Sequence, residues 1–101
     1  KEVALPSTLK LLSTGVFQKC ADLKTVRLGD DVELLSDYVF DGCPLTDLYI
    51  TAPLPPVCGS NTFATTGADF VKTCRLHVPK GRKKYYRANA KWNVFDNIVE
   101  E

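Results

Sequence analysis

Phe17-Gln18-Lys19-Cys20 returns 23 residues later as Phe40-Asp41-Gly42-Cys43. The same shift relates other apolar residues, which pair as Val3 with Val26, Leu5 with Leu28, Leu9 with Val32, Leu12 with Leu35, Val16 with Val39 and Phe40 with Phe63. A fixed period of about 20–29 residues with apolar residues at fixed positions is typical of solenoids, in which one unit cannot bury its apolar face alone. Because solenoids present surfaces more readily than clefts, the repeat favours binding over catalysis.

Each repeat divides into three short parts. A strand comes first, because apolar residues alternate with polar ones in 2–5, 25–28, 47–50 and 75–78. A turn then leads to a second extended piece, expected at 9–12 and 32–35. The third part, 14–19 and 37–42, is too short for a stable helix and suits a single helical turn.

The repeats predict one domain with four parts: a repeat at 1–24, a repeat at 25–46, an irregular terminal repeat at 47–78 and a cap at 79–101. The third repeat keeps its Phe but grows by an insertion around 65–69. In the cap we expect a polar helix over 82–89, followed by apolar residues that cover the solenoid end. These residues are Trp92, Phe95, Ile98 and Val99. The first strand has no comparable cap, so we expect further repeats before it or, without them, dimerisation through that open edge.

Composition excludes several classes of protein. Among 101 residues, 45% are hydrophobic and 25% charged, which is typical of a globular domain. The net charge of +1 provides no global field for nucleic acid or an anionic membrane. No apolar run approaches the roughly 18 residues of a membrane span. We therefore expect no nucleic-acid partner, no membrane span and no cofactor.

The four cysteines do not form a C-x-x-C pair, and the chain has one histidine, which argues against a zinc site. Cys20 and Cys43 occupy the same position of the repeat, so we expect them to lie side by side in the core. Cys58 and Cys74 flank the irregular segment, and the sequence leaves open whether they form a disulfide. That bond would stabilise the fold by about 3 kcal/mol in the chain-entropy model and would imply an oxidising compartment.

The units LPSTLKLLSTGVFQKCADLKTVRL and LGDDVELLSDYVFDGCPLTDLYI resemble BspA-type leucine-rich repeats, and the tail CRLHVPKGRKKYYRANAKWNVFDNIVEE resembles the way such arrays close. Departures are small: Val16 and Val39 replace the common Ala before Phe. The resemblance implies a strand-rich α/β fold, a right-handed leucine-rich-repeat solenoid with short parallel strands, helical turns and a C-terminal cap. It also implies a secreted or surface-anchored bacterial protein that serves adhesion and protein–protein contact.

Strand alternation indicates which residues point outward. If the apolar residues face the core, one outward column contains Ala4, Arg27, Tyr49 and His77, and a second contains Glu2, Thr25, Asp47 and Arg75. Tyr and Arg are enriched among interface hot spots. The candidate binding residues on this strand face are therefore Arg27, Tyr49, His77, Thr25, Asp47 and Arg75. The alternative is an ordinary solvated sheet face.

The strongest charge run lies in the expected cap helix, where basic residues alternate with tyrosines. It contains Lys80, Arg82, Lys83, Lys84, Tyr85, Tyr86 and Arg87. Such a run can contact a polyanion, for example a sulfated glycan, or form the solvated side of a capping helix. The overall charge near zero favours the second interpretation.

No residues are expected to be catalytic. The chain has no G-x-S-x-G, glycine-rich phosphate loop or H-E-x-x-H motif, and His77 has no acid at a telling spacing. Cys74 and His77 are three residues apart, which places them on opposite faces of a strand. The sequence thus predicts a non-catalytic module that binds another protein, such as a host matrix or cell-surface protein. A structural terminator for upstream repeats and a polyanion-binding module are the alternatives.

Overall fold

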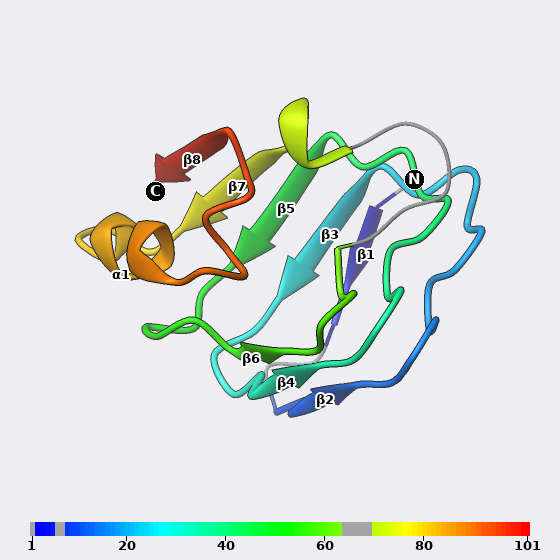
Figure 1. The fold of residues 1–101 in the computed structure, drawn as a ribbon, viewed down its shortest axis with the longest axis horizontal. Helices are drawn as coiled ribbons and strands as arrows, with labels where there is room; N and C mark the ends of the chain where they lie inside the picture. Colours follow the sequence, from blue (N-terminus) through cyan, green and yellow to red (C-terminus); the bar gives the residue numbers. More distant parts are fainter. Residues whose placement is uncertain (1, 6–7, 64–69) are drawn as a thin grey trace.

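The computed structural model describes residues 2–5, 8–63 and 70–101. In it, two sheets of parallel strands face each other across the core (Figure 1). In this part of the chain the larger sheet contains, in spatial order, β1 (Glu2–Ala4), β3 (Thr25–Leu28), β5 (Asp47–Ile50), β7 (Arg75–Val78) and β8 (Asn97–Glu100). The smaller sheet contains β2 (Leu11–Leu12), β4 (Leu34–Leu35) and β6 (Val57–Cys58). The chain alternates between the sheets, so the predicted leucine-rich-repeat solenoid is confirmed.

The strand register of the larger sheet places the alternating apolar residues of successive strands in one inward column. Val3 pairs with Val26, Val26 with Leu48, Leu48 with Leu76 and Leu76 with Ile98. Val26, Leu48 and Leu76 are fully buried, because every second side chain of a strand points to the same face. The outward columns follow from the same alternation.

Strand β8 was not expected from the sequence. The prediction that Val99 covers the solenoid end is wrong, because Val99 pairs with His77 on the outward face and is 39% exposed. Ile98, its neighbour, is 4% exposed and extends the buried column. The tail thus adds a fifth rung to the larger sheet in the described chain.

The turns between the sheets stack on one another through backbone hydrogen bonds. The amides of Gly15, Phe17 and Lys19 donate to the carbonyls of Asp37, Val39 and Asp41, at 3.0, 3.1 and 2.6 Å. The rings of Phe17 and Phe40 stack with centroids 6.0 Å apart and planes 2° apart. Phe17 and Phe40 thus occupy equivalent positions of successive turns, as the 23-residue shift predicts.

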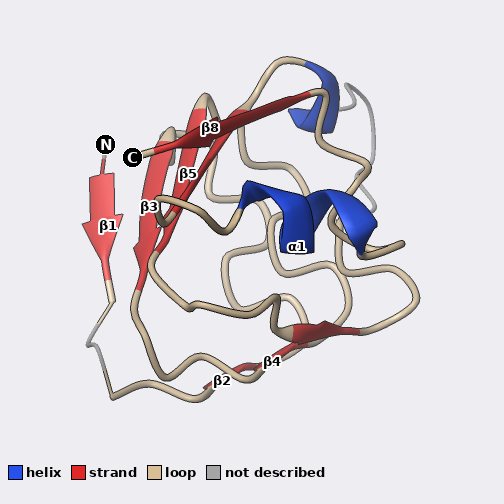
Figure 2. Ribbon diagram, turned by 90° about the vertical axis from the view of Figure 1, so that its left-hand side faces the viewer, coloured by secondary structure: helices blue, strands red, loops and turns tan. Residues whose placement is uncertain are grey.

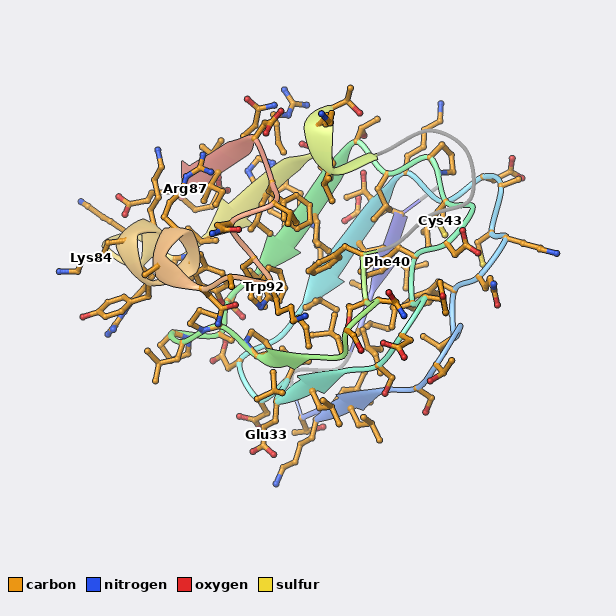
Figure 3. The ribbon with its side chains drawn as sticks, viewed as in Figure 1. Glu33, Phe40, Cys43, Lys84, Arg87 and Trp92 are labelled. Carbon is orange, nitrogen blue, oxygen red and sulfur yellow. The ribbon has the colours of Figure 1, made fainter. Side chains whose placement is uncertain are left out.

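The cap packs on the third repeat through aromatic side chains. Helix α1 (Lys83–Ala88) lies within the predicted range, and Tyr86, Trp92 and Phe95 are fully buried. The indole Nε1 of Trp92, labelled in Figure 3, donates to the carbonyl of Pro56 at 2.9 Å, and the Phe63 ring meets Trp92 edge-on at 5.0 Å. A short 3-10 helix η1 (Phe70–Lys72) precedes β7. The insertion expected around 65–69 lies outside the described residues.

All four cysteines are free, Cys58 and Cys74 included. Cys58 belongs to β6 of the smaller sheet, whereas Cys74 directly precedes β7 of the larger one, so the repeat does not bring this pair together. Cys43 is buried as predicted, and its thiol donates to the carbonyl of Phe17 at 2.9 Å. The prediction that Cys20 is buried is wrong: it is exposed, because within the described chain no repeat packs on its outer side.

Candidate functional site on the strand face

Three outward side chains on successive strands of the larger sheet form a continuous stack, which we call the strand ladder: Arg27, Tyr49 and His77. The register pairs Arg27 with Tyr49 and Tyr49 with His77. The Arg27 guanidinium lies over the Tyr49 ring with 4.0 Å from Cζ to the centroid, and the Tyr49 and His77 rings stack at 4.0 Å with planes 10° apart. Both faces of the Tyr49 ring are therefore covered.

Asp47 is the centre of the polar contacts beside the strand ladder. Its carboxylate accepts hydrogen bonds from Nε and a terminal nitrogen of Arg75, at 2.9 and 3.2 Å, and contacts Nε2 of His77 at 2.8 Å. Hydrogen bonds from Arg75, His77 and Thr46 outweigh desolvation and lower the pKa of Asp47 to about 2. Asp47 is thus a fixed negative charge at neutral pH.

The sequence interpretation of His77 as lacking an acid partner is corrected by these contacts. Asp47 faces its Nε2, and a carboxylate oxygen of Glu101 lies 2.9 Å from its Nδ1. Only 11% of the His77 side chain is exposed. Asp47 lies two residues before Tyr49, the register partner of His77, so the contact is a diagonal neighbour in the sheet.

The remaining candidate on the strand face, Thr25, lies in β3 next to Glu2, a residue of the same outward column. Glu2 forms an ion pair with Nε of Arg27, while Thr25 is half-buried between the rungs of Glu2 and Asp47. The structure therefore brings all six predicted residues onto one face, where Arg27, Tyr49, Asp47, Arg75 and His77 interact with one another. Cys74 is fully buried and lies apart from this outward face, as the sequence predicts.

The basic run on α1 divides into residues with different environments. Arg87 donates to the carbonyls of Phe95 and Asp96, at 2.8 and 3.0 Å, so its guanidinium fixes the cap backbone. The charged ends of Arg82 and Lys84 both lie 5.3 Å from the centre of the Tyr85 ring. Figure 3 shows Lys84 at the outer side of α1. The four basic candidates are Arg82, Lys83, Lys84 and Arg87. Of these, Arg87 has a structural role in the cap.

The smaller sheet carries an exposed apolar column that the sequence interpretation missed. Leu11, Leu34 and Val57 are paired in register and are 48%, 38% and 67% exposed. A signal was present in the sequence: Leu11-Leu12 and Leu34-Leu35 are consecutive apolar pairs, and adjacent strand residues point to opposite faces.

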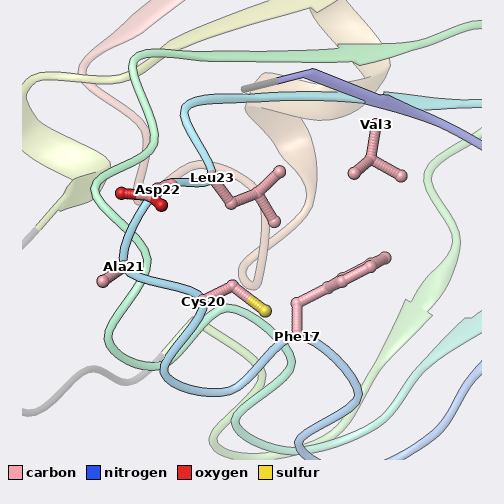
Figure 4. Close-up of a pocket in the computed structure, with 6 residues that line it drawn as sticks. All are labelled: Val3, Phe17, Cys20, Ala21, Asp22 and Leu23. Carbon is pink, nitrogen blue, oxygen red and sulfur yellow. The ribbon is translucent and has the colours of Figure 1, made fainter.

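A cavity of about 340 Å³ opens at the first repeat. Figure 4 shows Val3, Phe17, Cys20 and Leu23 around it, together with Ala21 and Asp22. Val3, Phe17 and Cys20 correspond to Val26, Phe40 and Cys43, which are buried. This is the edge where the sequence predicts further repeats or dimerisation.

The parallel register, the stacked turns and the stacked rings of Phe17 and Phe40 define a leucine-rich-repeat solenoid. The model of the BspA type leucine rich repeat region, with six copies of the repeat, matches residues 1–73, and the chain belongs to this family. No curated protein and no solved structure matches the chain. Repeats of this family commonly mediate protein interactions and are generally non-enzymatic.

Within the described ranges, no group of three or more His, Cys, Asp or Glu side chains could hold a metal ion. In the same part of the chain, no helix has the length and apolar character needed to cross a membrane.

Proposed function

We propose that this chain is a non-catalytic adhesion module of an exported bacterial leucine-rich-repeat protein, and that it binds another protein through the strand face. The observation that carries the proposal is the strand ladder. Its Arg, Tyr and His side chains are stacked at 4.0 Å and fixed by Glu2, Asp47 and Glu101. Side chains that are already ordered lose less conformational entropy on binding. Tyr and Arg are also the residue types that contribute most at protein interfaces.

The family supports the location and the class of partner. Repeats of the BspA type are typical of bacterial surface proteins, so host matrix or cell-surface proteins are the partners that we propose. Solenoids bind with extended faces formed by equivalent positions of successive repeats. The outward columns of the larger sheet have this arrangement.

The test is binding of the purified chain to a panel of host matrix proteins and glycans. A variant with Arg27→Glu and Tyr49→Ala should lose binding, because it removes the ladder's cation and its central ring. A variant with Lys83→Gln and Lys84→Gln is the matched control, since it changes two exposed residues of α1. Circular dichroism should show that both variants keep the fold. Loss of binding in the control alone would contradict the proposal.

The buried cap favours a second candidate, a structural terminator. Trp92, Tyr86 and Phe95 are fully buried against the third repeat, whereas Arg87 binds backbone carbonyls. A chain that binds no member of the panel would favour this role. Polyanion binding through α1 is distinguished by salt, because such binding weakens steeply as ionic strength rises.

A further inference from the structure

The strand ladder is closed at one end and open at the other. Beyond His77, the next outward rung is Val99 of β8. Before Arg27, the next outward rung is Ala4 of β1, at the sheet edge shown in Figure 2. Ala4 carries only a methyl group, so among the described residues this rung presents no larger side chain to the Arg27 guanidinium, whose other neighbour in the ladder is Tyr49.

The contacts of Arg27 limit what can occupy this rung. Glu2 already binds Nε, so the guanidinium is held in place and one of its hydrogen-bonding edges is used. What remains is a planar cationic face about one strand spacing, roughly 4.7–4.9 Å, from the empty position. A guanidinium face attracts the π face of an aromatic ring, as Tyr49 already illustrates on the opposite side.

The surrounding charge indicates which kind of macromolecule would bring the ring. Three carboxylates, those of Glu2, Asp47 and Glu101, lie along the ladder beside two arginines, Arg27 and Arg75, so carboxylates are in excess. A nucleic acid would place phosphates near these groups at an electrostatic cost, whereas an uncharged aromatic side chain carries no such cost. The site therefore suits a protein partner.

We propose that the open rung above Ala4 receives an aromatic side chain of the partner protein, which stacks on Arg27 and extends the ladder to four planar groups. This deepens the adhesion proposal and rests on it, because it names the chemistry by which a partner is held at the strand face. The partner residue is Trp, Tyr or Phe in an exposed loop or extended segment.

The test uses N-acetyl-tryptophanamide as the probe and follows the Arg27 Nε–H and the Ala4 and Arg27 amides by NMR. We expect saturable shifts in the millimolar range, with N-acetyl-leucinamide binding roughly fivefold more weakly. Ala4→Leu should abolish the shifts by filling the rung, whereas Ala4→Ser keeps the rung open and should retain them. Arg27→Lys should also abolish them, because it keeps the charge and loses the planar face.

The proposal is overturned if the leucine probe binds equally well, if Ala4→Leu still binds, or if adenosine monophosphate binds more tightly than the tryptophan probe. These outcomes are separate from those of the binding panel. The two proposals can fail separately. If the Arg27→Glu, Tyr49→Ala variant loses binding to a protein of the panel but the wild type does not bind the tryptophan probe, the adhesion proposal is retained and the aromatic rung is rejected.

Discussion

Lys19 and Gly42 occupy the same position in successive repeats, and both have a left-handed backbone conformation, with φ of 61° and 81°. Gly15 and Tyr38 form a second such pair, with φ of 66° and 57°. The turn therefore has two left-handed residues in each of the first two repeats, and in each of these repeats glycine occupies only one of the two positions. L-residues adopt this conformation at a cost of roughly 1–2 kcal/mol.

Gly42→Ala should destabilise the protein more than the conformational cost alone. A Cβ on Gly42 would lie 3.1 Å from Cα of Lys19, which is backbone and cannot rotate away. Gly81→Ala is the matched control, since φ is again 81° and nothing lies within 4 Å of the added Cβ. In urea unfolding we expect Gly42→Ala to lose at least about 1 kcal/mol more than the control. Equal losses of unfolding free energy in the two variants would show that the backbone of Lys19 moves away from the added Cβ at no further cost.

Tyr86→Phe should weaken the attachment of the cap to the third repeat. The buried Tyr86 hydroxyl donates to the carbonyl of Ala52 at 2.8 Å, and its removal leaves that carbonyl without this donor. We expect a loss of about 1–3 kcal/mol in the free energy of unfolding. Tyr85→Phe removes the same atom from a ring that is 39% exposed and should change stability by no more than about 0.5 kcal/mol. Comparable losses in the two variants would contradict a structural role for the Tyr86 hydroxyl.

Asp47 should contribute stability that depends on pH. Its pKa is lowered from 3.8 to about 2, with the Arg75 hydrogen bond as the largest cause. A lowered folded-state pKa gives stability that is present above the unfolded value and lost as pH falls toward 2. Arg75→Gln should therefore raise the midpoint of the Asp47 carboxyl in a carbon-13 NMR titration. The stability difference between the wild type and this variant should shrink between pH 4 and 2.

Lys72→Gln serves as the control for this titration, because it removes one positive charge from an exposed residue that does not contribute to the Asp47 shift. An equal rise of the Asp47 midpoint in both variants would assign the effect to overall charge and not to the Arg75 hydrogen bonds.

The periodic parts of this fold could be predicted from sequence because burial enforces them. Val26 and Leu48 must face the core, so alternation also places Arg27 and Tyr49 on the outer face. Strand β8 was missed because Ile98 is its only buried residue, and one apolar residue gives no alternation. The turn conformations were missed because glycine marks only one of the two left-handed positions in each of the first two repeats.

The candidate site could be predicted as a set of residues but not as a set of contacts. Register alone brings Arg27, Tyr49 and His77 together, whereas their stacking depends on side-chain rotamers. The diagonal contact between Asp47 and His77 spans 30 residues and follows only when the register and the side-chain directions are both known. Glu101 reaches His77 through β8, whose presence the sequence did not indicate.

Thiol labelling should separate the exposed Cys20 from the other cysteines. Burial raises the pKa of Cys58 and of Cys74 to about 12, and burial also raises the pKa of Cys43. Since the thiolate is the reactive form, these three groups should react slowly with iodoacetamide at pH 8. Mass spectrometry should find one label per native chain, on Cys20, and four after unfolding in denaturant. Cys20→Ser should remove the rapid label, and rapid native labelling of Cys58 or Cys74 would show that the contacts between the cap and the third repeat open readily.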